Sequence, residues 1–196
     1  DPGSRIYAGL RPGVDRHQLQ SALQQGACET CLHQFEPAAG DCVFIPAGTV
    51  HALGAGLVVA EIQQASDTTF RLYDWDRVDA QGQPRPLHIE QSLETIDYER
   101  GPVRPQTPLP TSDPACERLV ECDKFILARR RIGATQQLGG DDRFRIVAVV
   151  EGAISLDGDP SQTPLERGAT ALLPAAAGVV TVAGTPSTVV LEIHLP

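Results

Sequence analysis

A glycine, a proline and a histidine stand at fixed spacing in the segment GDCVFIPAGTVHALGAG. The pattern is Gly40-x5-Pro46-x-Gly48-x2-His51. A Pro-x-Gly turn ends one strand and reverses the chain, so the histidine begins the next strand. Its imidazole is a good ligand for zinc, iron, nickel or copper. A lone histidine is more often a packing or surface residue, so the surrounding motif carries the prediction of a metal ligand.

The segment AEIQQASDTTFRLYDWDR, residues 60–77, is unusually polar for a region with strand character. Alternate residues of a strand share a face, so Glu61 and Gln63 are predicted to point the same way, as are Thr69, Arg71 and Tyr73. A carboxylate and a guanidinium on the inner wall of a barrel could bind the hydroxyl and phosphate groups of a sugar. The alternative is a solvated strand edge with a surface ion pair.

Composition and charge limit the possible partners. The chain has 196 residues, a net charge of -9 and 41% hydrophobic residues, which is typical of a globular protein. It has no basic stripe that would follow a phosphate backbone, so nucleic acid is not an expected partner. No apolar run approaches the roughly 18 residues of a membrane span, and no signal peptide is visible. The sequence therefore predicts a cytoplasmic protein without a membrane partner.

The five cysteines show no disulfide or metal framework. They are Cys28, Cys31, Cys42, Cys116 and Cys122. The first two have CxxC spacing, but a zinc site would need a second pair at a matching distance, and a thioredoxin-like site would need a βαβ context. We therefore predict reduced cytosolic thiols.

The expected elements are mostly short strands. A helix is predicted over 13–26, with Asp15 as N-cap and Gly26 after its C-terminus. A second short helix is expected within 86–96. The predicted strands are 42–45, 57–63, 68–74, 125–131, 144–150, 153–156, 170–173, 179–182 and 188–194.

A proline-rich connector and an internal repeat organise the chain. Residues 101–114, GPVRPQTPLPTSDP, are predicted to link a first domain, 1–100, to a second, 115–196. Gly168-x5-Pro174 repeats the spacing of the first motif, but Val179 stands where His51 would be expected. Two antiparallel units of this kind predict an all-β fold of jelly-roll type, with the first unit functional and the second structural.

The motif from Gly40 to His51 matches a sequence signature of the cupin superfamily, the second of its two. The longer segment that contains it resembles one family within that superfamily. Residues 40–77 resemble the core of the type I mannose-6-phosphate isomerases in their short bacterial form. PRPLHIEQSLETI, residues 84–96, and LVECDKFILARRRI, residues 119–132, resemble later segments of that family. The resemblance implies two cupin-type jelly-roll barrels with a few short helices, the first barrel incomplete and the second without metal.

The resemblance also implies an activity. Members of this family interconvert mannose 6-phosphate and fructose 6-phosphate through a cis-enediol, with one zinc ion in the first barrel. His51 matches a zinc-ligand histidine, Arg71 an arginine of the active site, and Glu61 a glutamate near the metal that assists proton transfer. No role is assigned to four further residues of these motifs, which are Asp67, Thr69, Asp74 and His88.

The family's other zinc ligands, a Gln/His pair and a glutamate, precede the helix expected at 13–26. Glu29, His33 and Glu36 are alternatives by composition only. The chain begins Asp1-Pro2 and contains no methionine. We therefore expect an N-terminally truncated form that cannot complete the zinc site without further residues. Its oligomeric state is left open.

Two other functions fit parts of the sequence. A non-catalytic sugar-binding or regulatory cupin that has lost its metal site would explain the missing ligands. A metal-dependent dioxygenase is a weaker alternative, because such cupins need two or three histidines close together and the TTFRLYDW segment does not suit them.

Overall fold

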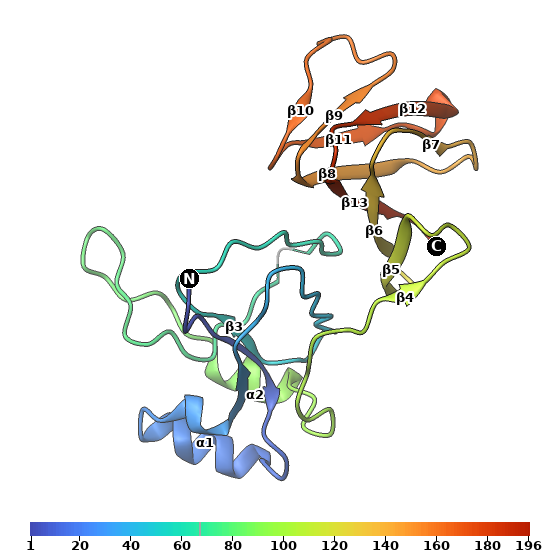
Figure 1. Cartoon of the computed structure of the whole chain (residues 1–196). Coiled ribbons are helices and arrows are strands. Elements are labelled where there is room, and N and C mark those ends of the chain that lie inside the picture. Colours follow the sequence, from blue (N-terminus) through green and yellow to red (C-terminus); the bar gives the residue numbers. More distant parts are fainter. Residues whose placement is uncertain (67) are drawn as a thin grey trace. The chain divides into compact units, whose positions relative to one another are not determined.

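The computed structural model describes residues 1–66 and 68–196. The chain divides into two compact units, Asp1–Pro105 and Gln106–Pro196. Both are built around antiparallel sheets (Figure 1), as the all-β prediction requires. In the described part of the chain, no helix is long and apolar enough to cross a membrane.

The first unit is organised around a small antiparallel sheet with the strand order β2-β1-β3. Its strands are β1 (Ile6–Leu10), β2 (Leu32–Phe35) and β3 (His51–Leu53). Its helices are α1 (Arg16–Gln24), the 3-10 helix η1 (Cys28–Cys31) and α2 (Ile89–Thr95). The chain also returns to β1 from the far end of the unit, where the amide of Val103 donates to the carbonyl of Ala8. A Cβ atom at Gly9 would overlap the carbonyl oxygen of Gly101, so this close approach requires glycine.

The first helix forms as predicted. Asp15 caps it by accepting from the amide of Gln18, whose side chain in turn accepts from the amide of Asp15, which is a capping box. Gly26, just past the helix, has a φ of 67°. Leu19 is fully buried in a core cluster formed mostly by α1, η1, α2 and one side of the sheet. The short helix expected within 86–96 is α2 and contributes Leu93 to the same cluster.

Three strand predictions in the first unit are wrong. Residues 42–45, 57–63 and 68–74 form no strand. The described residues provide no neighbouring strand for any of the three segments, and a strand requires a partner for its backbone ladder. Val58 is consequently 98% exposed. Strands β1 and β2 were not predicted, whereas β3 begins at His51 as the turn motif predicted.

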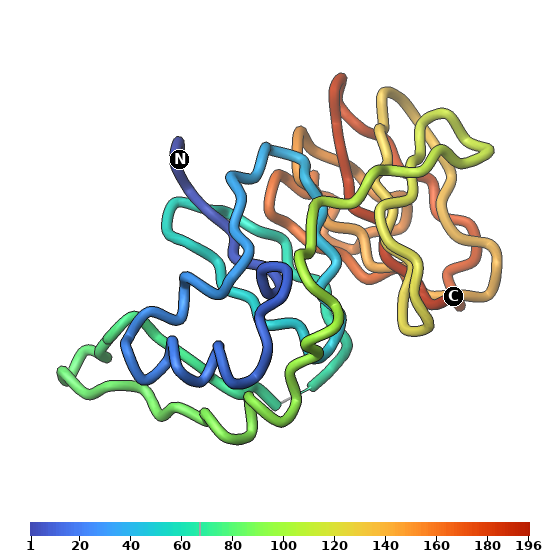
Figure 2. Tube along the Cα trace, turned by 90° about the horizontal axis from the view of Figure 1, so that it is seen from below, coloured from blue at the N-terminus to red at the C-terminus, as the bar shows by residue number. Residues whose placement is uncertain are grey.

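Most of the third segment, 68–74, forms one arm of a long hairpin instead of a strand. The chain runs out from residue 70 and returns to residue 88, and its two arms lie side by side in both views (Figures 1 and 2). A bridge joins Val78 to Pro84, and the amide of Asp79 donates to the carbonyl of Gln83 near the tip. Nearer the base, Arg85 makes a bidentate ion pair with Asp74, with 2.7 Å between Nε and Oδ2. This pair lowers the pKa of Asp74.

The second unit contains two antiparallel sheets. Their strand orders are β10-β9-β12-β7 and β11-β8-β13-β6-β5-β4. The strands are β4 (Leu109–Pro110), β5 (Cys116–Glu121), β6 (Ile126–Ile132), β7 (Thr135–Gly139), β8 (Arg145–Glu151), β9 (Ala153–Leu156), β10 (Leu165–Glu166), β11 (Thr170–Leu173), β12 (Val179–Gly184) and β13 (Thr188–His194), and the 3-10 helix η2 is Ala175–Ala177. The six strands predicted here are confirmed within two residues; β4, β5, β7 and β10 were not predicted.

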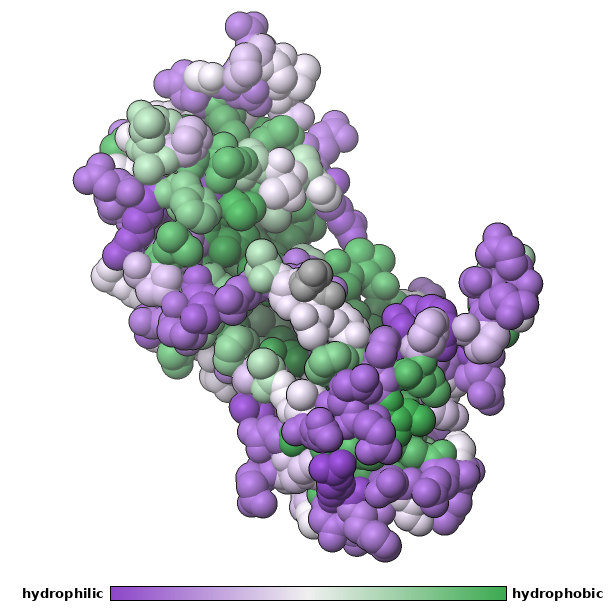
Figure 3. Space-filling model, turned by 180° about the vertical axis from the view of Figure 1, so that it is seen from behind, coloured by the Kyte–Doolittle hydropathy of each residue, from purple (hydrophilic) through white to green (hydrophobic). Residues whose placement is uncertain are grey.

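Apolar side chains from both sheets fill the core of the second unit. Val147, Val182 and Val190 have no exposed surface. Figure 3 shows further apolar residues gathered over part of this unit's surface. Those that are exposed include Leu172 and Val179. The remaining apolar surface of Leu172 and Val179 therefore lies at exposed strand positions.

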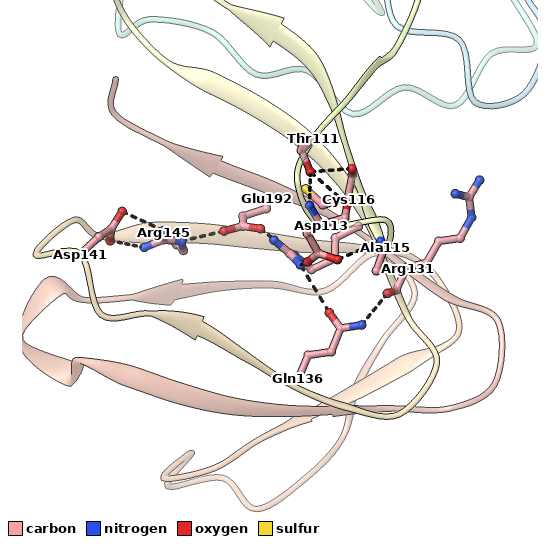
Figure 4. A network of polar contacts seen from close by, with 10 residues as sticks. Thr111, Asp113, Ala115, Cys116, Arg131, Gln136, Asp141, Arg145 and Glu192 are labelled. Atoms are coloured by element: carbon pink, nitrogen blue, oxygen red, sulfur yellow. Dashed lines mark hydrogen bonds and ion pairs between the residues drawn. The ribbon is translucent and has the colours of Figure 1, made fainter.

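A chain of alternating charges is centred on Glu192 in the second unit (Figure 4). Glu192 of β13 is only 4% exposed. Its two carboxylate oxygens accept from Arg130 Nε at 2.9 Å and from Arg145 Nε at 2.6 Å. Each arginine also pairs with an outer carboxylate, Arg130 with Asp113 and Arg145 with Asp141. Burial of Glu192 is tolerated because both oxygens are paired with cations.

The internal repeat is visible in the backbone. Gly40 and Gly168 begin the two copies with φ angles of 91° and 90°. His51 is then the first residue of β3, and Val179 is the first residue of β12. The two copies therefore present a histidine and a valine from the same place in the motif.

Loss of the Glu192 carboxylate is expected to destabilise the second unit. Glu192→Gln leaves two poorly exposed guanidinium groups without their shared anion, which costs about 3 kcal/mol. Trp75 and the three tyrosines all lie in the first unit, so urea unfolding of the second unit must be followed by circular dichroism or hydrogen exchange of β13 peptides. Glu151→Gln, on an exposed residue of β8, is the matched control. Equal unfolding midpoints for the two variants would contradict the prediction.

Acid is expected to weaken the same unit. Hydrogen bonds from Arg145 lower the pKa of Asp141 from 3.8 to about 2. Because the folded state has the lower pKa, the ionised carboxylate stabilises it above pH 3.8, and this contribution disappears as the pH falls from 3.8 to about 2. Asp141→Asn should flatten the fall of the urea midpoint over this range, whereas Asp142→Asn, an exposed neighbour, should leave it unchanged. A flat profile for the unmodified chain would refute the assignment.

Candidate functional site

The turn before His51 is fixed to the C-terminal end of α2. The amide of Thr49 donates to the carbonyl of Pro46, and the amide of Asp97 donates to the carbonyl of Gly48. Gly48 has a φ of 81°, and a Cβ atom there would lie 2.9 Å from the carbonyl oxygen of Thr95. Only glycine satisfies both constraints, which explains the Pro-x-Gly part of the motif.

His51 has its ring oriented by the backbone. It opens β3 opposite Ala8 of β1, and its side chain is exposed. Its Nδ1 lies 3.0 Å from the carbonyl oxygen of Thr49. A carbonyl only accepts, so Nδ1 carries the proton and Nε2 keeps its lone pair. Metal-binding histidines are commonly held in this way, so His51 fits the role of a single metal ligand.

Arg71 is held by the returning arm of the hairpin. Its Nη1 donates to the carbonyl of Pro86 at 3.1 Å, and its backbone exchanges two hydrogen bonds with His88. A guanidinium has five N–H groups, and this is its one hydrogen bond among the described contacts. The half-buried side chain can therefore still donate to a sugar hydroxyl or a phosphate.

Glu61 is exposed in an irregular segment. Among the described contacts, no hydrogen bond or ion pair joins it to His51 or to Arg71. Residues 1–66 and 68–196 also contain no group of three or more His, Cys, Asp or Glu side chains that could hold a metal ion. The structure thus holds His51 and Arg71 through separate contacts, and a joint site of these two residues with Glu61 stays a prediction.

Two of the three residues considered as alternative ligands, Glu29 and His33, have other contacts. Glu29 accepts from Trp75 Nε1 at 2.8 Å. His33 stacks near Phe35, with 6.0 Å between ring centroids, and burial together with Arg104 and Arg11 lowers its pKa. Glu29 thus accepts a hydrogen bond from an aromatic side chain of the first unit, and His33 lies beside Phe35 on β2.

Of the four residues to which the sequence assigned no role, those that the structure describes differ in their contacts. Asp74 holds the hairpin through Arg85, Thr69 is exposed, and Asp67 lies outside the described residues. His88, by contrast, contacts Arg71 directly. One feature of the sequence could have indicated these two contacts. Arg71 and Asp74 are three residues apart on one arm of the hairpin, and Arg85 and His88 are three residues apart on the other.

The CxxC cysteines belong to the core of the first unit. Cys28 and Cys31 are free and buried in η1. Burial, reinforced by the proximity of Cys31 and Glu29, raises the pKa of Cys28 to about 12. This thiol is therefore protonated near neutral pH, unlike a reactive or metal-binding thiolate.

The chain resembles proteins of one kind. Residues 116–193 match the family model described as mannose-6-phosphate isomerase, cupin domain. Mannose-6-phosphate isomerase ManA of Bacillus subtilis (strain 168) is 32% identical over 160 residues, which are 81% of this chain and 51% of that protein. The mannose-6-phosphate isomerase of Streptococcus mutans is 32% identical over 176 residues, covering 89% and 55%.

A solved structure agrees with these relatives. The crystal structure of the mannose 6-phosphate isomerase from Bacillus subtilis matches with a TM-score of 0.86 and 27% identity, over 100% of this chain and 62% of that chain. This chain spans about half the length of the curated relatives it matches. These matches extend over both units, so the chain is similar to mannose-6-phosphate isomerases along most of its length.

Proposed function

We propose that the protein containing this chain interconverts mannose 6-phosphate and fructose 6-phosphate. Relatives that carry this name match both units. The observation that carries the proposal is the orientation of His51, whose Nδ1 faces the carbonyl of Thr49. This leaves Nε2 as a ligand atom at the position of the family motif.

The proposed reaction moves one proton between neighbouring carbons. A base removes the proton from carbon 2 of mannose 6-phosphate, and the oxygen on carbon 1 takes up a proton to give the cis-enediol. A proton is then returned to carbon 1 while the hydroxyl on carbon 2 loses its proton, which gives the ketone of fructose 6-phosphate. Glu61 is proposed to assist this transfer as general base and acid. Negative charge develops on the substrate oxygens, and the guanidinium of Arg71 is proposed to stabilise it.

Zinc is part of the proposal. When bound, zinc supplies a Lewis acid and a template that orients the substrate oxygens. A catalytic zinc site ordinarily takes three protein ligands. His51 fits as one of them, but the described residues place no second and third ligand beside it.

That last observation favours a second candidate function, a non-catalytic sugar-binding or regulatory cupin. Such a protein would bind a sugar phosphate without exchanging its carbon-bound protons. Isomerisation in D₂O separates the two functions, because an enediol path incorporates deuterium at carbon 1 of fructose 6-phosphate and simple binding does not. The assay should use the product of the whole reading frame that encodes this chain.

Replacing His51 is expected to remove both metal and activity. His51→Ala deletes a ligand, and even the partners of ligands are worth about 10- to 100-fold in affinity or activity, so the loss should be at least this large. Bound zinc is measured by elemental analysis and isomerisation by NMR. His17→Ala, on the exposed surface of α1, is the control and should keep both. Full zinc content in His51→Ala would exclude the ligand role.

Replacing Arg71 is expected to separate turnover from metal binding. Arg71→Ala removes a donor to the charge that develops during proton transfer, so kcat should fall about 100- to 1000-fold with the zinc content unchanged. Arg77→Ala, an exposed arginine of the same hairpin, should behave like the unmodified protein. An unchanged kcat in Arg71→Ala would reject the assignment.

A further inference from the structure

We infer that His88 is a positioning residue for Arg71, holding it through a hydrogen bond from the Arg71 amide to the imidazole Nδ1. This inference rests on the role proposed above for Arg71. It assigns a function to a side chain that lies outside the predicted ligand and catalytic set.

The contact replaces one bond of a β-ladder. The amide of His88 donates to the carbonyl of Arg71 at 2.8 Å, as a neighbouring strand would. The return bond goes to a side chain, because the Arg71 amide donates to His88 Nδ1 at 3.1 Å. The ring therefore completes a reciprocal pair between the two arms of the hairpin.

The guanidinium end of Arg71 is held by the same arm. Nη1 donates to the carbonyl of Pro86, two residues before His88. Three residues further along each arm, Asp74 and Arg85 form the bidentate pair. The backbone and the side chain of Arg71 thus both bind residues 86–88 of the returning arm. The Asp74–Arg85 ion pair joins the same two arms three residues further toward the tip.

His88 connects that segment to the core. It is the N-cap residue of α2, and its carbonyl accepts from the amide of Ser92 at 2.9 Å. Leu93 of the same helix is 1% exposed and packs in one cluster with Leu72, the neighbour of Arg71. The hydrogen bonds to His88 therefore fix Arg71 to a packed helix, although the segment that contains Arg71 has no strand partner.

The bond also specifies the state of the ring. Because the Arg71 N–H is the donor, Nδ1 carries no proton, and in the neutral ring the proton lies on Nε2. His51 has the opposite arrangement, since its Nδ1 faces a carbonyl. The two histidines are thus distinguishable by nitrogen NMR.

Two substitutions separate positioning from general packing. The Oδ1 of asparagine has the same reach from Cβ as Nδ1, so His88→Asn keeps an acceptor, whereas His88→Leu has similar branching and no acceptor. In the whole-reading-frame protein, His88→Leu is expected to lower kcat about 10- to 100-fold with KM and zinc content nearly unchanged. His88→Asn should retain most of the turnover. Equal kcat values for the two variants would overturn the inference.

A second readout does not depend on activity. In the 196-residue chain, ¹⁵N spectra should show Nδ1 of His88 without a proton. The heteronuclear NOE of the Arg71 Nε–H should fall in His88→Leu and persist in His88→Asn and in His17→Leu. A protonated Nδ1, or an Arg71 side chain equally ordered in His88→Leu, would overturn the contact. If the unmodified protein does not isomerise mannose 6-phosphate, the proposed function fails, and these spectra still decide the role of His88.

Discussion

Every buried backbone amide and carbonyl needs a hydrogen-bond partner, and this requirement decides where strands form in the chain. In the second unit, β13 has β6 on one side and β8 on the other. In the first unit, β1 is flanked in the same way by β2 and β3. Where no strand is adjacent, side chains replace part of the ladder, as the ring of His88 does for the amide of Arg71.

Local sequence was sufficient to predict the fold wherever the signal is itself local. Asp15 and Gly26 enclose α1 because capping and a left-handed turn depend on neighbouring residues. The strand predicted over 188–194 likewise became β13, since partners were present on both sides. The similar pattern of 57–63 predicted a strand that is not there, because pairing depends on distant residues that no local pattern contains.

The site was predictable to a smaller extent. The motif around His51 correctly indicated a constrained turn, and Gly48 shows why its glycine is needed. Spacing could not reveal that Glu192 is buried between two arginines, whereas Glu61 is exposed. Charge pairing across strands follows from register. No role could be assigned to His88 from the sequence for the same reason, because its contact joins residues 17 positions apart.

The attachment of residues 101–103 to β1 has a consequence for biosynthesis. Gly9 bridges to Pro102, and Val103 donates to Ala8, so the first strand of the first unit is completed by nearly its last residues. During translation, β1 leaves the ribosome long before this partner does. The first unit can therefore reach its final structure only after its whole length has emerged, and contacts of such high sequence separation form slowly. A nascent chain that stops before Val103 would leave the carbonyl of Ala8 without the Val103 amide that binds it in the folded unit.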